Sequence, residues 1–443
     1  MCDAAIHAPL LDYAPANGFG NQVQTLRVAL HMAVRLNRTL VLPPMVPRKY
    51  TNPKGAGSHW SFHAGNCRWD RQMNKDCVET DCVVANAADM INRTSEFSKH
   101  ADDYVPLWHV LDRSAMEAIV PVINRRELEQ HLACHPVADQ EVQVSAVKCS
   151  NAVLVDDPAR HRTGIRCPTM KGCMRLDVRS EYGASRARLL RFGSLFHTSD
   201  FVPLTHGYNV DGIDDVRAPN YTLTASIIRA TARFSPALRK IGCAVTAELS
   251  AQYGGLVVAY HLRGDDSPTA SSLMGPSLHR SYTLFLYRLA RLQARFEAAI
   301  NEKRARGHIE ATGYVRSKRS AAPASQTSAV LLLLSNLDLK TIERHSMWKK
   351  SFGRLRRNLK SISGITHLDI RTLSDFPWAK KQVEQLLPGA GADAHGLVEI
   401  VAAASTPGGF LGGPSTFSSF ISEQRALAPP CAAVRRRDAV RVV

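Results

Sequence analysis

The N-terminal part of the chain alternates between apolar runs and a glycine-rich turn. Pro9–Tyr13 predicts a strand, and Asn17–Asn21 is rich in glycine but lacks the spacing of the dinucleotide fingerprint. Apolar residues recur at helical spacing over Val23–Val34, which predicts a helix closed by Asn37. The apolar run Thr39–Leu42, stopped by two prolines, predicts a buried strand. Together these segments predict a βαβ unit.

The C-terminal half alternates apolar runs with amphipathic segments. The predicted strands are Leu256–Leu262, Val330–Leu334, Thr366–Ile370 and Phe410–Leu411. The predicted helices are Thr222–Tyr253 with a break at Pro236, Tyr282–Arg304, Leu339–Arg356, Ala392–Ala404 and Phe417–Ala428. Further upstream, Arg113–Cys134 reads as helical. Alternating strands and helices predict a parallel, doubly wound sheet.

Two of these strands end in chemistry suited to an anionic ligand. The strand Leu256–Leu262 carries His261 near its end and runs into Arg263, and polar residues at this end of a parallel strand lie where open α/β sheets bind ligands. The strand Phe410–Leu411 is followed by two glycines and a Pro-Ser-Thr step, after which a helix begins. Unpaired N–H groups and the helix dipole make such a helix N-terminus a phosphate site.

Three segments together resemble the GDP-fucose protein O-fucosyltransferase family. They are GFGNQ with LNRTLVLPP (Gly18–Gln22 and Leu36–Pro44), HLRGDD (His261–Asp266) and FLGGPSTFSSFISEQR (Phe410–Arg425). Related glycan α-1,2- and α-1,6-fucosyltransferases use similar elements but double the arginine, where this chain has Gly264. The resemblance implies an α/β fold class with two Rossmann-like domains facing a cleft, a GT-B-like arrangement. It also implies a fucosyltransferase enzyme.

The expected division of the chain has three parts. Residues 1–208 form an N-terminal α/β domain, Cys-rich and on the acceptor side, and residues 222–443 form a C-terminal domain that binds the nucleotide sugar. Residues 209–221, rich in Gly, Asp and Pro, are the expected linker.

The resemblance implies a set of residues that contact the donor. They are Phe19, Gly20, Asn21, His261, Arg263, Asp265, Asp266, Asn336, Asp338, Ser415, Thr416 and Phe417. Arg263 is the expected catalytic residue, because a guanidinium fork stabilises charge that grows on a leaving diphosphate. Asn21 is the second, polarising the acceptor hydroxyl or the glycosidic oxygen. The plainer alternatives are an ion pair for Arg263, a helix cap for Asn21 and a satisfied core histidine for His261.

Two features of the expected chemistry stay open. The family often ends its next strand in Thr-Asp, where this chain has Ser335-Asn336, so Asp338 is the substitute carboxylate. The candidate general bases are Asp265, Asp266 and Glu399, although Glu399 is expected to face solvent from mid-helix or to make an i,i+4 contact. No spaced pair of aspartates stands near a strand end, so we expect no metal and no cofactor beyond the donor substrate.

Three functions are consistent with these residues. The first is inverting transfer of fucose from GDP-fucose to a Ser or Thr hydroxyl of a protein, with a glycoprotein as partner. The second is transfer to a glycan hydroxyl. The third is a catalytically silent protein of the same fold that binds a glycan or nucleic acid.

The cysteines and sequons favour the lumen of the endoplasmic reticulum or Golgi. Eight of the ten cysteines precede residue 174, which predicts disulfides among Cys67, Cys77, Cys82, Cys134, Cys149, Cys167 and Cys173. Asn37, Asn92 and Asn220 begin N-x-T sequons of a glycoprotein. Too few residues precede Pro9 for a secretory signal, so we expect the natural N-terminus to lie upstream; a cytoplasmic protein with free thiols is the alternative.

Charge and the remaining cysteine pattern raise two further partners. The formal net charge of +17 would suit nucleic acid, but few aromatic residues stand among the basic clusters, so no nucleic-acid partner is expected. Zinc could use Cys77 and Cys82 with His59, His63 and Cys67, although the paired spacing of zinc sites is missing. No apolar run is long enough for a transmembrane segment.

Overall fold

The computed structural model describes the residue ranges that carry the two sheets. These are residues 8–14, 19–45, 105–134, 142–145, 153–157, 162–166, 182–194, 222–253, 256–262, 294–298, 301, 327–335, 346–363, 365–412, 416–427 and 429–431. The chain divides into two compact units: the first is formed mainly by residues 1–238 and the second mainly by residues 239–443. The expected linker 209–221 and the stretch Tyr50–Cys82 lie outside the described residues.

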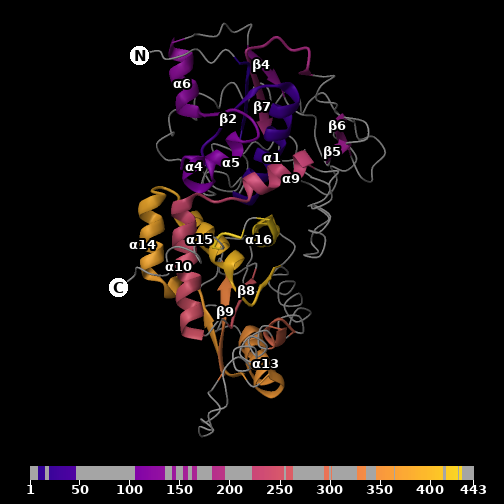
Figure 1. Cartoon of the computed structure of the whole chain (residues 1–443). Coiled ribbons are helices and arrows are strands. Elements are labelled where there is room, and N and C mark those ends of the chain that lie inside the picture. The colour runs from indigo at the N-terminus through magenta and orange to yellow at the C-terminus, as the bar shows by residue number, and fades with distance from the viewer. Residues whose placement is uncertain are drawn as a thin grey trace, which may run out of the picture. The chain divides into compact units, whose positions relative to one another are not determined.

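The first unit contains a five-stranded parallel sheet (Figure 1). Its strands are β1 (Leu10–Ala14), β2 (Thr39–Leu42), β3 (Val122–Asn124), β4 (Val142–Ser145) and β7 (Leu189–Ser194), in the order β3-β2-β1-β7-β4. Its helices are α1 (Phe19–Leu36), α4 (Leu107–Val110), α5 (Arg113–Glu117), α6 (Arg125–Cys134) and α9 (Thr222–Thr231). A separate antiparallel pair is formed by β5 (Val153–Asp157) and β6 (Arg162–Arg166). The predicted βαβ unit at β1, α1 and β2 is confirmed.

The prediction that Arg113–Cys134 is helical is wrong in one respect, because the strand β3 separates two helices there. The apolar residues of β3 pair with β2, and Asn124 then caps α6. The main-chain N–H of Asn124 donates to Glu127 Oε2 at 2.6 Å, and the N–H of Glu127 donates to Asn124 Oδ1 at 2.8 Å. This reciprocal capping starts the helix at Arg125 and so ends the strand.

A buried carboxylate joins three elements of the first unit. Asp12 of β1 is 1% exposed, and its Oδ2 accepts from Arg125 at 2.9 Å and from Arg191 at 3.0 Å. These two ion pairs hold α6 and β7 against the central strand β1. Loss of either arginine would leave the buried carboxylate partly uncompensated, which is destabilising.

The second unit contains a four-stranded parallel sheet in the order β10-β9-β8-β11. Its strands are β8 (Val257–His261), β9 (Thr327–Leu334), β10 (Ile365–Arg371) and β11 (Phe410–Leu411). Its helices are α10 (Pro236–Tyr253), α13 (Ser346–Ser363), α14 (Pro377–Leu386), α15 (Ala392–Ser405) and α16 (Thr416–Leu427), with a short 3-10 turn η8 (Leu373–Asp375). The mixed α/β class with two parallel sheets is therefore confirmed, and so is the break between two helices before Pro236.

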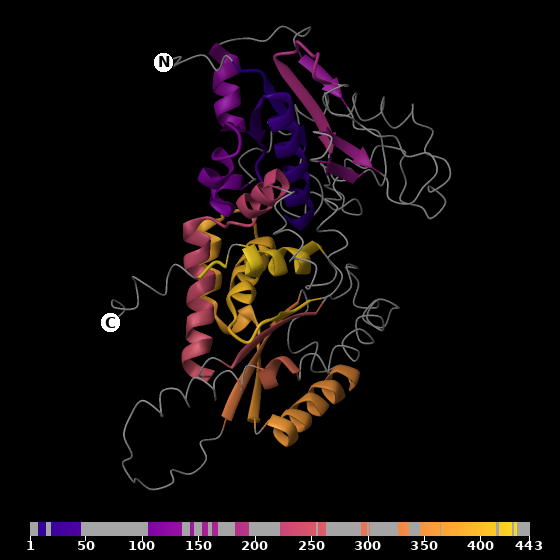
Figure 2. The same ribbon diagram turned by 45° about the vertical axis from the view of Figure 1, so that its right-hand side comes forward.

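Helices cover both faces of the four-stranded sheet. Alternate strand residues, among them Val258, Tyr260 and Leu331, pack in one core cluster with Phe352 and Leu355 of α13. On the opposite face lies α10, and both views show α10 and α13 on opposite sides of the strands (Figures 1 and 2). Since side chains alternate along a strand, His261 of β8 belongs to the α10 face.

A disulfide joins Cys243 of α10 to Cys431, which lies 188 residues further along the chain in the segment after α16. Neither cysteine belongs to the cluster in which disulfides were predicted. Within that cluster Cys134 is disulfide-bonded, and the other six lie outside the described residues. None of the helices in the described ranges is long and apolar enough to span a membrane.

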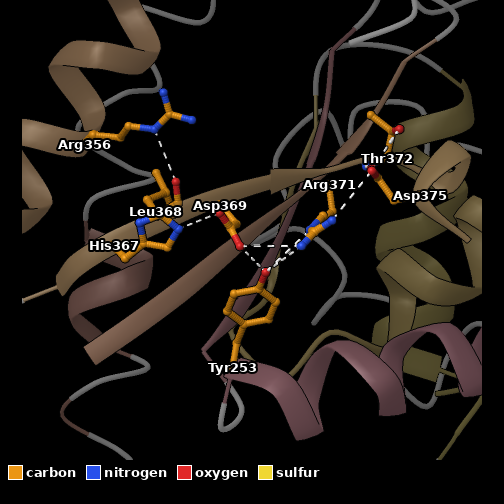
Figure 3. A network of polar contacts seen from close by, with 8 residues as sticks. All are labelled: Tyr253, Arg356, His367, Leu368, Asp369, Arg371, Thr372 and Asp375. Carbon is orange, nitrogen blue, oxygen red and sulfur yellow. Dashed lines mark hydrogen bonds and ion pairs between the residues drawn. The ribbon is translucent and has the colours of Figure 1, made fainter. Parts of the chain in front are cut away.

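A polar network ties the end of α10 to β10 at the edge of the sheet (Figure 3). The hydroxyl of Tyr253 donates to Asp369 Oδ2, and His367 Nε2 lies 2.7 Å from Asp369 Oδ1. Arg371 approaches the Tyr253 oxygen at 3.4 Å and Asp375 at 3.7 Å. Partial burial by itself would raise the pKa of Asp369, but the hydrogen bonds from Tyr253 and His367 and the charge of Arg371 lower it.

We expect Asp369→Asn to destabilise the protein by about 1–3 kcal/mol at neutral pH, since it removes the charged acceptor of these hydrogen bonds. A lowered pKa in the folded state means that this stability is present above the ordinary carboxyl pKa and is lost as pH falls through the lowered value. Urea unfolding at pH 7 and pH 3.5 measures this. The control is Glu129→Gln, which removes an exposed carboxylate of α6. Equal unfolding midpoints for Asp369→Asn and Glu129→Gln would contradict the role.

Candidate functional site

Adjacent strands of the second unit bring two of the three motifs together. β8 pairs in parallel with β9, where His261 lies opposite Leu334, and with β11, where Tyr260 lies opposite Leu411. The carboxyl ends of the three strands therefore meet at one edge of the sheet. In open α/β sheets this edge is where ligands bind.

His261 is held by the first turn of α16. Its Nδ1 lies 2.7 Å from the hydroxyl oxygen of Ser418, although the two residues are 157 positions apart. Its ring centroid is 4.7 Å from that of Phe417, with the planes tilted by 41°. Ser418 is 3% exposed, so its hydroxyl has a fixed position. Ser418 was not among the residues predicted from the sequence, and its only signal was its place three residues after Ser415.

At Gly408 and Gly412, on either side of β11, other parts of the chain come too close to leave room for a side chain. A Cβ on Gly412 would lie 2.5 Å from Ser418 Oγ and 2.8 Å from the Phe410 ring. A Cβ on Gly408 would lie 2.7 Å from the carbonyl oxygen of Val257. The turn can therefore pass against β8 and α16 only without side chains, and this brings the helix N-terminus to the sheet edge. Its first N–H groups and dipole favour an anion there.

The predicted residues of this edge are placed in part. His261 and Phe417, two of the residues predicted to contact the donor, touch one another. Thr416 is the first residue of α16, and for this position the structure describes the main chain. The remaining six predicted residues of the second unit lie outside the described residues: Arg263, Asp265, Asp266, Asn336, Asp338 and Ser415.

In the first unit, the GFGNQ motif differs from its predicted conformation. The sequence predicts a glycine turn over Asn17–Asn21, but α1 begins at Phe19, so Phe19, Gly20 and Asn21 form its first turn. The alternative that Asn21 caps this helix is wrong, because Asn21 is its third residue. Phe19 stacks on Phe234 with ring centroids 6.0 Å apart and an angle of 18°. Phe19 therefore has a packing role within the first unit.

The last arginine of the third motif is structural. Arg425 Nη1 donates to the carbonyl oxygens of Ala403 and Ala404 at 3.2 Å and of Thr406 at 2.8 Å. Ala403 and Ala404 belong to the last turn of α15 and Thr406 follows it, so the guanidinium lies at the negative end of this helix, where a cation is stabilising. Burial, together with the nearby charge of Arg295, lowers the pKa of Arg425 to about 10. The motif thus combines a candidate ligand site with the cap of the preceding helix.

Glu399 of α15 differs from the solvent-facing position that was one of its two predicted alternatives. Its side chain is partly buried, and this burial raises its pKa from an ordinary 4.5 to about 8 despite the opposing charge of Lys380. One turn earlier on α15, a Cβ on Gly396 would lie 3.8 Å from the Phe417 ring. Glu399 therefore sits on a helix that packs beside His261's aromatic neighbour. A carboxylic acid that titrates near neutral pH is suited to proton transfer.

Within the described ranges, no three His, Cys, Asp or Glu side chains form a group that could hold a metal ion. The residues of the zinc alternative, His59, His63, Cys67, Cys77 and Cys82, lie outside those ranges.

Comparison with solved structures finds similarities at low sequence identity and with TM-scores below 0.5. A structure of POFUT1 in complex with GDP has a TM-score of 0.42 and 13% identity, covering 95% of this chain and 96% of that chain. A structure of POFUT1 in complex with GDP-fucose has a TM-score of 0.41 and 12% identity, and the match covers 95% of this chain and 96% of that chain. A variant of Arabidopsis thaliana FUT1 in complex with GDP has a TM-score of 0.35 and 10% identity, and the match covers 96% of this chain and 70% of that chain. No family model matches the sequence, and none of the curated proteins matches it significantly.

We expect Gly412→Ala to destabilise the second unit by about 1–3 kcal/mol, because the added methyl group overlaps Ser418 and the Phe410 ring. Ser418→Ala removes the hydrogen bond to His261 and should cost about 1 kcal/mol. The matched control is Gly353→Ala on α13, whose Cβ meets nothing nearer than Arg357 at 3.7 Å and should stabilise the helix slightly. Urea unfolding gives the free energy of unfolding of the three variants. A Gly412→Ala variant as stable as the unmodified protein would contradict the close contact of Gly412 with Ser418 and Phe410.

We expect Glu399→Gln to change how stability depends on pH. Because the pKa of Glu399 is raised on folding, the native state binds a proton between about pH 4.5 and pH 8 that the unfolded chain releases. This contribution to stability is fully present below pH 4.5 and is lost as pH rises toward 8. Thermal unfolding at pH 5.5 and pH 8 should show a smaller difference for Glu399→Gln than for the unmodified protein. Identical pH dependence in the two proteins would show that the carboxyl is not buried.

Proposed function

We propose that this chain transfers fucose from GDP-fucose, with inversion at the anomeric carbon, to a Ser or Thr hydroxyl of a protein. The contact between His261 and the first turn of α16 carries the proposal. It joins the HLRGDD and FLGGPSTFSSFISEQR motifs, 157 residues apart, at one sheet edge. These are two of the three segments that resemble the GDP-fucose protein O-fucosyltransferase family.

In this mechanism the bond between the anomeric carbon and a β-phosphate oxygen breaks, and its electron pair stays on the diphosphate. The N–H groups and dipole of α16 stabilise that charge without moving, since they are fixed by packing around Gly412. Arg263, two residues after His261, supplies a guanidinium fork for the same oxygens. No metal ion is needed in this scheme.

The acceptor side is proposed to come from the other motif. The acceptor oxygen attacks the face of the sugar opposite the diphosphate, with Asn21 polarising the reacting oxygen. Asp265, Asp266 and Glu399 are the candidates to receive the acceptor proton. With a pKa raised to about 8, Glu399 is mostly protonated at neutral pH, so its use as a base would grow as pH rises toward 8.

The lumen of the endoplasmic reticulum or Golgi is the proposed compartment. The disulfide between Cys243 and Cys431 and the disulfide-bonded Cys134 support it, because disulfides persist in oxidising compartments.

Donor binding and transfer test the proposal directly. We expect calorimetry to show that GDP and GDP-fucose bind in the presence of EDTA, whereas ATP and NAD bind far more weakly. Arg263→Ala should reduce transfer by about a hundred- to a thousand-fold, as removal of a preorganised donor does. Arg263→Lys should recover little, because an ammonium cannot form the fork. The control is Arg126→Ala on the exposed face of α6.

A panel of acceptors separates the alternatives. Fucose transfer to folded protein domains supports the proposal, and transfer only to free glycans replaces it with a glycan fucosyltransferase. GDP-fucose binding without transfer to any acceptor would favour the silent binding protein. Full turnover by Arg263→Ala, with cooperative unfolding intact, would overturn the mechanism.

A further inference from the structure

The outward side of α13 carries an unusual concentration of positive charge. This eighteen-residue helix has no acidic residue and six basic ones: Lys349, Lys350, Arg354, Arg356, Arg357 and Lys360. All six are exposed. We call these six residues the α13 cationic surface. At 1.5 Å per residue it extends about 16 Å along the helix axis.

The charges of this surface are not neutralised within the described part of the chain. Arg356 Nε donates to the carbonyl oxygen of Leu368 at 3.2 Å, which is a neutral acceptor. The ion pairs of the described residues involve none of the six. Like charges spaced along one helix repel one another, so their concentration costs stability unless an anion binds.

The apolar side of α13 is already occupied. Phe352, Leu355 and Leu359 are at most 2% exposed and belong to the core beneath the sheet. The surface that remains presents charge without an apolar stripe. α13 lies on the face of the sheet opposite α10 (Figure 2). His261 belongs to the α10 face, because its neighbours Tyr260 and Leu262 pack on the α13 side. The α13 cationic surface is therefore separate from the candidate donor site.

We propose that the α13 cationic surface binds a linear acidic polysaccharide, one whose repeating units carry sulfate or carboxylate groups. Guanidinium and ammonium groups spaced along a helix match anions spaced along a polymer, and guanidinium forks pair bidentately with sulfate. This binding does not depend on fucosyl transfer, so either property can be lost without the other.

Other polyanions fit this surface less well. Single-stranded nucleic acid binds through bases stacked on aromatic side chains. Of the two aromatic residues of this helix, Phe352 is buried, and Trp348 precedes it by one helical turn, a position on the same side of the helix. A membrane-surface helix must insert its apolar side, which here packs in the protein core. A polysaccharide needs neither a stacking platform nor an apolar stripe.

Charge reversal on one side of the helix tests the proposal. The probe is a fluorescent, fully sulfated heparin dodecasaccharide, and anisotropy gives its Kd at two salt concentrations. The test variant is the triple substitution Lys350→Glu, Arg354→Glu and Arg357→Glu. The matched control reverses three exposed charges of α9, α10 and α14: Arg229→Glu, Lys240→Glu and Lys381→Glu. Both triple variants change the net charge equally.

We expect the unmodified protein to bind the dodecasaccharide with an affinity that falls steeply with salt, as polyanion binding does when counterions are released. The α13 triple should weaken binding at least tenfold, whereas the control should weaken it by no more than about twofold, since only the former removes direct contacts. Replacement of the same three α13 residues by Gln should also weaken binding. This Gln variant removes the three positive charges without adding negative ones, so it still tests the surface if the charge-reversed protein fails to fold.

Three results would overturn the proposal. Equal weakening by the two triple variants would show a general effect of net charge. Tighter binding of a single-stranded oligonucleotide, or of vesicles with anionic lipid, would assign the surface to a different partner. An unchanged Kd for the Gln variant, measured on protein with an intact unfolding transition, would exclude α13 from binding altogether.

Discussion

The pairing of β11 with β8 is the contact on which the candidate site depends. β11 is only two residues long, and it must bring the start of α16 to His261. It can do so because glycine at positions 408 and 412 removes the side chains that would meet Val257 and Ser418. The sheet thus fixes His261, the glycines set the approach of α16, and the hydrogen bond to Ser418 follows from both.

The sequence was a good guide to this architecture wherever one apolar pattern dominated. β2 and β11 have the predicted bounds, and β8, β9 and β10 differ from prediction by a few residues at their ends. β2, β8, β9 and β11 have near-continuous apolar runs that stand out from the helices around them. β10, at the sheet edge, alternates instead, with Leu368 and Ile370 buried and His367 exposed. Periodicity failed at β3, because a three-residue strand between two helices leaves no pattern of its own.

Contacts made across long sequence distances could not be predicted in the same way. The sequence places His261 at a strand end and Thr416 at a helix start, but nothing local indicates that Ser418 would meet the imidazole. Glu399 shows the same limit. Its position in mid-helix suggests solvent, whereas packing around α15 buries it enough to raise its pKa to about 8. Burial is a property of the assembled fold, so helical position alone does not give it.

Residues of one motif need not share one role, and the third motif shows this. Phe417 and Ser418 contact His261, Gly412 makes room for them, and Arg425 caps the helix that precedes the strand. A motif of this kind resembles a family because packing and binding constrain it together. Packing alone would still require Gly412 and Arg425, even in a protein that had lost its activity. The resemblance is therefore evidence for the local fold above all, and the transfer reaction must be decided by the substitutions of Arg263.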